Sequence, residues 1–188
     1  WNSYGVEVSI VEMLPHLLPL EDEEASVELE KAYKKRGIQV YTSSKVKSVK
    51  ADDSGTTVVL ETAEGEKEIK AEITLVAIGF RPNYKELGLE ALGVTMDKRG
   101  FIEVDEHMST NVPGIWAIGD VTGKLLLAHV ASTMGILCAE NIAGQPTEKI
   151  DYRMVPRATF SSPQVASFGY TEKQAKEGSF DVEIGKFP

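Results

Sequence analysis

Two carboxylates stand where strands are predicted to end, at positions from which a side chain can hold a ligand. Asp120 follows Gly119 directly after the apolar run Ile115–Ile118, and Glu12 directly follows the β-branched run Val6–Val11. In open α/β folds, ligands bind beyond the carboxyl ends of the strands. Carboxylate oxygens there can accept hydrogen bonds from sugar hydroxyls. Each residue also has a plainer interpretation: an Asx-turn or helix cap for Asp120, and a solvated strand end for Glu12.

Asp120 lies in a longer pattern, which distinguishes it from an isolated Gly-Asp. The segment Thr110–Asp120 reads TNVPGIWAIGD, with a threonine, an apolar strand and then Gly-Asp. A glycine-containing loop and an apolar helix follow. This order matches the flavoprotein pattern T-x4-hydrophobic-aromatic-Ala-hydrophobic-Gly-Asp at each position. The pattern favours a FAD contact at Asp120 over a cap.

Glu12 would end the second strand of a dinucleotide-binding unit. A carboxylate at that place can accept hydrogen bonds from both hydroxyls of an adenosine ribose, and it would repel the additional phosphate of NADP. The expected nucleotide is therefore NAD. The glycines of a phosphate-binding loop normally precede this acid by about 20 residues, and position 12 leaves no room for them.

The predicted elements that position these residues alternate between strands and helices. After the strand at 6–11 we expect a loop at 13–21, a helix over 23–36 closed by Gly37, and a strand at 38–41. A β-meander over 45–50, 56–61 and 67–71 leads to a buried strand at 73–78. A second unit contains the turn Asp97–Gly100, the strand at 115–118 and a helix over 129–143. Short strands at 158–161 and 165–170 and a helix at 172–176 follow.

Composition limits the classes of function. At 188 residues and 42% hydrophobic, the chain can bury a core, and its net charge of −9 argues against nucleic-acid binding. We expect the acidic run Glu21–Glu24 to begin a solvent-facing helix rather than to bind a metal or a partner. The single cysteine, Cys138, excludes an internal disulfide framework and is predicted to be buried and inert. No segment long enough to span a membrane and no leader peptide is expected.

Several ordered motifs together resemble the class I pyridine nucleotide-disulfide oxidoreductases, and among them the dihydrolipoamide dehydrogenases. Besides Thr110–Asp120 they comprise Val76–Asn83, the sequence Leu-Leu-Ala-His at 126–129, and Val155–Glu172, which resembles the opening of the family's dimerisation domain. Arg usually stands where this chain has Phe80, a departure that bears on the loop's specificity more than on the fold.

The resemblance implies a fold, a domain division and a set of cofactor contacts. The fold would be α/β, with a remnant of a Rossmann-like NAD domain (1–79), a central FAD-supporting unit (80–150) and the beginning of an α+β dimerisation domain (151–188). The cofactors would be FAD and NAD. The implied cofactor-binding residues are Glu12, Val46, Gly79, Asp120, Leu126, Leu127, Ala128 and His129.

The resemblance also implies an activity that these residues only partly support. The complete enzyme would oxidise dihydrolipoamide, carried on a lipoyl domain of a 2-oxo acid dehydrogenase complex, and pass electrons through FAD to NAD+. It would be a homodimer in the cytoplasm or in an organelle matrix or stroma. The redox Cys-x4-Cys pair and the His-Glu acid–base pair of that family do not occur here, so no residue is predicted to be catalytic. We expect the isolated chain to be inactive, and neither His16 nor His107 has a catalytic partner nearby in sequence.

Two alternatives remain open. The chain could belong to another flavin reductase of the same superfamily, of the glutathione, mercuric or soluble transhydrogenase type. It could also be a truncated, non-enzymatic module that binds nucleotides weakly.

Overall fold

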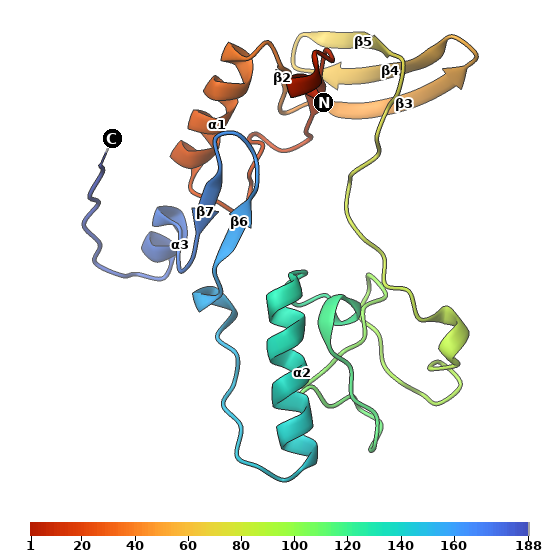
Figure 1. Ribbon diagram of the computed structural model, residues 1–188, viewed down its shortest axis with the longest axis vertical. Coiled ribbons are helices and arrows are strands. Elements are labelled where there is room, and N and C mark those ends of the chain that lie inside the picture. Colours follow the sequence, from red (N-terminus) through yellow and green to blue (C-terminus); the bar gives the residue numbers. More distant parts are fainter. Residues whose placement is uncertain (188) are drawn as a thin grey trace. The chain divides into compact units, whose positions relative to one another are not determined.

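The computed structural model describes residues 1–187 and divides the chain into two compact units (Figure 1). Unit 1 comprises Trp1–Val76 and the segment that begins at Ala158, and unit 2 is Ala77–Arg157. The strands are β1 (Ser9–Val11), β2 (Gln39–Tyr41), β3 (Lys45–Asp52), β4 (Gly55–Thr62), β5 (Gly65–Ala71), β6 (Arg157–Thr159) and β7 (Val165–Ser167). The α-helices are α1 (Glu23–Lys35), α2 (Ala128–Ile142) and α3 (Glu172–Glu177). The chain contains both helices and strands, in agreement with the α/β prediction.

Strand β1, helix α1 and strand β2 form a βαβ unit at the start of unit 1. The two strands pair in parallel, with Ile10 opposite Val40. Helix α1 buries Ser26 and Leu29, while the rest of its surface carries charges. It ends where predicted, because Gly37 has a φ of 80°, a conformation that glycine adopts without steric cost. The expected loop at 13–21 is also present.

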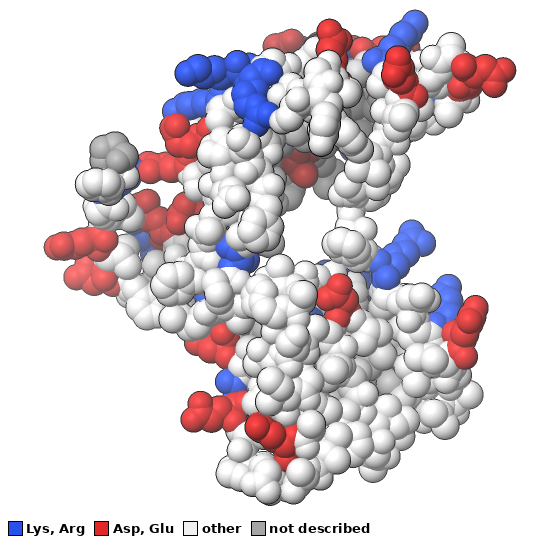
Figure 2. Space-filling model, viewed as in Figure 1, with Lys and Arg blue, Asp and Glu red and all other residues white. Residues whose placement is uncertain are grey.

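The acidic run at the start of α1 does more than face solvent. The Asp22 carboxylate accepts a hydrogen bond from the Glu172 backbone N–H at 2.9 Å, at the first residue of α3. Glu24 pairs with Lys186. Figure 2 shows a cluster of basic side chains at the upper left and acidic side chains at several other places on this face. The acidic helix start therefore binds the C-terminal segment within unit 1.

Strands β3, β4 and β5 form the predicted antiparallel meander. Its two turns lie at the predicted places, with Asp52 opposite Gly55 and Thr62 opposite Gly65. A bulge between Val46 and Ser48 shifts the register of β3. Inward-facing residues of the central strand β4, Val58 and Leu60, are buried. Each strand pairs with the next strand along the chain across a short turn, an arrangement that local turn signals specify well.

Two predicted strands do not form. Residues 73–78 are extended but pair with no strand of the described chain, and Ile73 and Ile78 are 81% and 94% exposed rather than buried. Residues 115–118 contribute only one isolated bridge, between Ser109 and Trp116. Both segments have the β-branched composition of a central strand. A strand also needs a partner for its backbone groups, and parallel partners come from distant parts of a chain.

Unit 2 is built around α2, which lies one residue ahead of its predicted bounds. Val130, Met134 and Cys138 follow one another at four-residue spacing and point into a core that contains Met108. Partly buried side chains complete this core: Trp116, Leu125, Leu127, Ile150, Tyr152 and Val155. Cys138 is buried and unpaired, as predicted, and burial raises the pKa of its thiol. No helix among the described residues is both long and apolar enough to cross a membrane.

The C-terminal segment forms the predicted short elements. Strands β6 and β7 pair with each other, although both are shorter than expected. Helix α3 begins with a capping box, in which the Thr171 hydroxyl accepts from the Gln174 N–H and the Gln174 side chain accepts from the Thr171 N–H.

Candidate functional site

The Gly-Asp sequence forms a tight turn that closes without using its carboxylate. Residues Gly119–Thr122 make one turn of 3-10 helix, designated η3. Gly119 has a φ of 74° and Gly123 a φ of 64°. The buried Thr122 hydroxyl donates to the Gly119 carbonyl at 2.8 Å, and the Gly123 N–H donates to the Asp120 carbonyl at 3.0 Å. The turn therefore depends on two glycines and a threonine hydroxyl.

The Asp120 side chain is exposed and forms no hydrogen bond or ion pair with any described residue. Other aspartates of unit 2 behave differently. Asp97 accepts from the N–H groups of Arg99 and Phe101 at 2.8 and 2.9 Å. Asp105 likewise closes its own turn, as a double acceptor from backbone N–H groups. A cap or Asx-turn, the plainer interpretation of Asp120, is thus absent from the described structure at this position.

The turn packs closely against the N-terminal half of α2. A Cβ added to Gly119 would lie 3.3 Å from the Ala131 Cβ, and one added to Gly135 would lie 3.4 Å from the Ile118 side chain. Ala131 and Gly135 are four residues apart and so lie on one face of the helix. Small side chains on that face allow the Asp120 turn to approach the first turns of α2.

The predicted segment 126–129 forms the entry to α2. Leu127 is the N-cap residue in an extended conformation, and its side chain cannot cap the helix. The first backbone N–H groups of a helix have no partner within that helix. Here they start at Ala128, and the helix dipole adds partial positive charge at the same place. The Leu127 N–H already donates to the Leu125 carbonyl at 2.9 Å, so the backbone donors that this segment offers begin at Ala128. The cofactor contacts of Leu126, Leu127, Ala128 and His129 stay a prediction.

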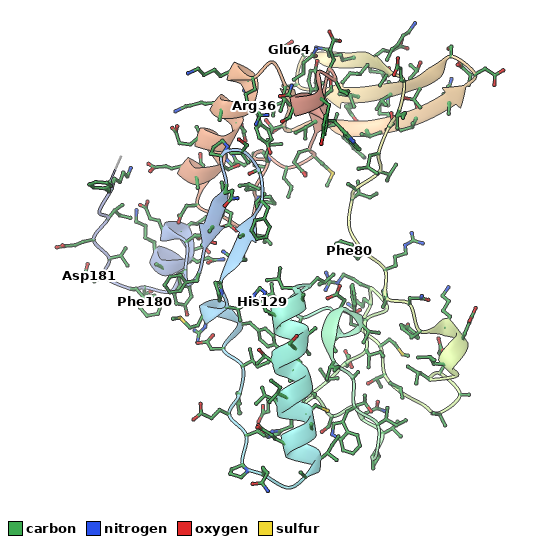
Figure 3. All side chains as sticks on the ribbon, in the orientation of Figure 1. Arg36, Glu64, Phe80, His129, Phe180 and Asp181 are labelled. Atoms are coloured by element: carbon green, nitrogen blue, oxygen red, sulfur yellow. The ribbon has the colours of Figure 1, made fainter. Side chains whose placement is uncertain are left out.

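His129 is held by the backbone rather than poised for proton transfer. Its Nε2 lies 2.9 Å from the Pro156 carbonyl oxygen, and Figure 3 shows the side chain at the first turn of α2. Because a carbonyl oxygen only accepts, Nε2 carries the hydrogen in this contact. The imidazole therefore fastens α2 to the segment that precedes β6.

Glu12 lies at the carboxyl end of β1, where the sequence predicts it. Its backbone N–H donates to the Tyr41 carbonyl at 2.8 Å and its carbonyl accepts from the Ser44 N–H at 3.0 Å. Its Oε1 accepts from the Leu14 N–H at 2.8 Å. The Ser43 N–H donates to the Leu14 carbonyl at 2.9 Å. These bonds join the loops after β1 and β2 and orient a half-buried carboxylate whose Oε2 has no described partner.

Val46 belongs to unit 1 and Gly79 to unit 2. Val46 is 44% exposed on β3, two residues after the buried Ser44, so it offers apolar surface beside the loop that binds Glu12. Gly79 has a φ of 126°, a region that other residues rarely adopt, and no atom lies within 4 Å of the place of a Cβ. Phe80, labelled in Figure 3, is 77% exposed.

The chain matches a known protein family over most of its length. The family described as pyridine nucleotide-disulphide oxidoreductase matches residues 1–135. This chain belongs to that family. The dimerisation domain of the same family matches residues 155–188, where β6, β7 and α3 lie.

Within this family, the chain is similar to several individual proteins and solved structures. Over its whole length the chain is 50% identical to a dihydrolipoyl dehydrogenase of Mycobacterium leprae and 45% identical to one of Corynebacterium glutamicum. It spans 40% and 41% of their lengths. The crystal structure of LpdA from Mycobacterium tuberculosis matches 95% of the chain with a TM-score of 0.85 and 31% identity, over 38% of that structure. The flavoprotein disulfide reductase RclA of Escherichia coli matches 94%, with a TM-score of 0.82 and 25% identity, over 40% of that structure.

The predicted contacts of this oxidoreductase chain fall into two groups. Glu12 and Val46 lie in unit 1, and Gly79, Asp120 and the entry to α2 lie in unit 2. The family uses a pyridine nucleotide and FAD. Glu12 and Asp120 offer carboxylate acceptors, and the first turn of α2 offers backbone N–H groups.

Sequence reasoning missed residues that shape the site without contacting a ligand. Thr122 closes the Asp120 turn, and Ala131 and Gly135 leave room for it. Ala131 and Gly135 could have been recognised in the sequence, because two small residues at four-residue spacing on a helix mark a close approach of backbones. Ser43 and Ser44, which hold the Glu12 loop, carried no comparable signal, because their bonds cross between two strands.

Proposed function

We propose that this chain supplies part of the NAD site and part of the FAD site of a dihydrolipoamide dehydrogenase. The whole enzyme would oxidise dihydrolipoamide and pass the electrons through FAD to NAD+. The dihydrolipoyl dehydrogenases among its relatives, which are 45–50% identical over the entire chain, support this activity.

The observation that carries the proposal is the free carboxylate of Asp120. It stands on a turn that closes without it, against the N-terminal half of α2, where neutral side chains would serve the fold equally well. Ribityl hydroxyls of FAD would donate hydrogen bonds to its two oxygens. The N–H groups at the entry to α2 would face negative charge on the flavin, which a helix N-terminus stabilises.

Glu12 would bind the adenosine ribose of NAD. Leu14 already donates to Oε1, and this bond fixes the plane of the carboxylate. Oε2 and the remaining lone pair of Oε1 would then accept from the two ribose hydroxyls. A 2′-phosphate at the same place would meet the negative charge of Glu12, so NAD should be preferred to NADP. Val46 would contact the adenine side of the nucleotide.

The remaining chemistry belongs to the cofactors and to groups outside these 188 residues. Bound FAD would relay electrons between the dithiol–disulfide couple and the nicotinamide. The described residues orient the cofactors: Gly79 lets backbone approach closely, and His129 fixes the entry to α2 through Pro156. We propose no catalytic residue in this chain.

The test uses the protein expressed from its complete coding sequence, with Asp120 replaced by Asn. Asparagine keeps the size of the side chain but removes its charge and replaces one acceptor with a donor. We expect FAD affinity to fall by about 10–100-fold, since a charge-assisted hydrogen bond is worth about 1.5–3 kcal/mol. Asp105→Asn is the matched control, because that residue serves its own turn. Equal flavin affinity in wild-type and Asp120→Asn protein would reject the proposed FAD contact.

A second experiment separates dihydrolipoamide from the substrates of related flavin reductases. The complete protein should reduce NAD+ with dihydrolipoamide far faster than it turns over glutathione disulfide or mercuric ion. A reversed order of the rates would assign the chain to another branch of the superfamily; the disulfide reductase RclA is also similar to this chain. The isolated 188-residue chain should show no lipoamide turnover. A micromolar or tighter dissociation constant of the isolated chain for FAD or NAD would instead favour the binding-module alternative.

The complete protein would be a homodimer that accepts dihydrolipoamide from the lipoyl domains of a 2-oxo acid dehydrogenase complex. The match of residues 155–188 to the family's dimerisation domain supports the dimer. A cytoplasmic location is part of the same proposal, because one unpaired cysteine suits a reducing compartment.

A further inference from the structure

A pocket of about 350 Å³ opens in unit 2 beside the core that α2 forms. Its buried side is apolar, since Met108 is 1% exposed and Ile150 and Tyr152 are partly buried. The chain that follows α2 runs back alongside the helix (Figure 1), and Ile150 and Tyr152 pack against the same core as Met108. The volume lies within the range of small-molecule sites. None of the residues with a proposed cofactor contact lines this pocket.

Four charged side chains line the exposed side of the pocket, and two of them neutralise each other. The Lys149 Nζ lies 2.7 Å from the Glu106 Oε1. The other two, Asp105 and Lys124, form no ion pair with each other or with any other described residue. A direct ion pair fills its part of the rim, whereas two separated charges of opposite sign leave room for a ligand between them.

Asp105 and Lys124 both keep hydrogen-bonding capacity for such a ligand. The Asp105 Oδ1 accepts the N–H groups of His107 and Ser109, both at 2.8 Å, while no described group donates to its Oδ2. The Lys124 ammonium has three donors and no described acceptor. A free carboxylate oxygen and a free ammonium beside an apolar wall fit a molecule that carries an ammonium, a carboxylate and an apolar group.

We propose that this pocket binds a zwitterionic amino acid with an apolar side chain: its carboxylate pairs with Lys124, its ammonium pairs with Asp105, and its side chain packs on the apolar wall. A ligand with a single charge would leave one of the two free groups unpaired. Asp105 and Lys124 are exposed, so each ion pair contributes little to the affinity. Burial of the apolar side chain supplies the larger share.

The test measures the dissociation constant of L-phenylalanine for the complete protein by isothermal titration calorimetry. We expect saturable binding with a constant on the order of 1 mM. L-Phenylalaninamide lacks the carboxylate and N-acetyl-L-phenylalanine lacks the ammonium, so each should bind about fivefold more weakly, in keeping with the loss of one exposed ion pair. The absence of saturable binding of L-phenylalanine up to about 10 mM would overturn the proposal. Equal affinities of the three ligands would overturn it as well.

The variant Lys124→Met tests the partner of the ligand carboxylate. Methionine retains the apolar stem but has no ammonium, so the affinity for L-phenylalanine should fall about fivefold while that for L-phenylalaninamide stays the same. An equal fall for both ligands would mean that Lys124 only shapes the pocket, which would overturn its role. Lys98→Met is the matched control, because Lys98 is an exposed lysine of unit 2 outside the pocket. This control should bind both ligands like wild type.

The variant Asp105→Asn tests the partner of the ligand ammonium. It should weaken the binding of L-phenylalanine about fivefold and leave that of N-acetyl-L-phenylalanine unchanged. Asp105 also closes its own turn, so the urea midpoint of this variant is measured in parallel. If the variant is too unstable to assay, the Lys124→Met comparison decides.

The variant Ile150→Ala tests the apolar wall. It should weaken the binding of all three phenylalanine derivatives by a similar factor, because it removes an apolar contact that they share. Unchanged affinities would reject this wall as the place of the ligand side chain, and with it the proposed site.

Discussion

Three aspartate turns of unit 2 use their carboxylates in different ways. Asp97 and Asp105 each accept two backbone N–H groups and so close their own turns. The turn that contains Asp120 is closed by the Thr122 hydroxyl and by the left-handed backbone of Gly119 and Gly123. The Asp120 carboxylate takes no part in closing its turn, so it is available to a ligand. The comparison therefore separates two aspartates that stabilise the fold from one whose carboxylate is free for the FAD contact that we propose.

Gly123→Ala should have the largest effect on stability, because Gly123 closes the turn that contains Asp120. A Cβ at this position would lie 2.5 Å from the Phe101 Cγ, and the φ of 64° disfavours alanine in any case. Overpacking and backbone strain together should cost about 2–4 kcal/mol of unfolding free energy. Urea unfolding of the flavin-free complete protein would measure it.

The control for Gly123→Ala is Gly144→Ala. Its φ of 72° is similar, but nothing lies within 4 Å of its added Cβ. This variant should lose only about 1 kcal/mol. Equal losses at the two positions would mean that the contact with Phe101 contributes little to the turn.

Thr122→Val should lower the unfolding free energy by about 1–2 kcal/mol, which is less than the loss expected for Gly123→Ala. The valine keeps the shape of the side chain but leaves the Gly119 carbonyl without the hydroxyl that now bonds to it at 2.8 Å. Thr122→Ser retains the hydroxyl and should recover most of the loss in the same urea experiment. If serine and valine destabilise equally, the methyl group rather than the hydrogen bond closes the turn.

The pH dependence of stability tests whether the Asp97 carboxylate, unlike that of Asp120, stabilises its own turn. Hydrogen bonds from Phe101, and then from Arg99, lower the pKa of its carboxyl. A lowered folded-state pKa adds stability that is present above the unfolded pKa, near 4, and is lost as the pH falls through the folded value. Asp97→Asn should therefore show a shallower decline of its urea midpoint than wild type between about pH 4.5 and pH 2.5. Identical slopes would contradict a role for the charge.

These turns also show what a sequence can specify. The meander β3–β5 and the turn at Asp97–Gly100 were predicted correctly, since alternation and turn residues act over short distances. The strand at 73–78 was wrong, because its apolar composition describes a buried strand but says nothing of the partner that would pair with it. Asp120 lies between these cases. Its place at the end of the Thr110–Asp120 pattern could be read from the sequence, although the strand expected at 115–118 forms only one isolated bridge. The freedom of its carboxylate depends on Thr122 and on the fit between Gly119 and Ala131.

Asp120→Asn should have the smallest effect on the fold. The urea midpoint of the flavin-free variant should match that of wild type, because no described hydrogen bond or ion pair is lost. In the presence of FAD the two proteins should separate, since a ligand stabilises only the state that binds it, by an amount that grows with its affinity. A variant that is already unstable without flavin would place Asp120 with Asp97 and Asp105, as a residue that the turn itself requires.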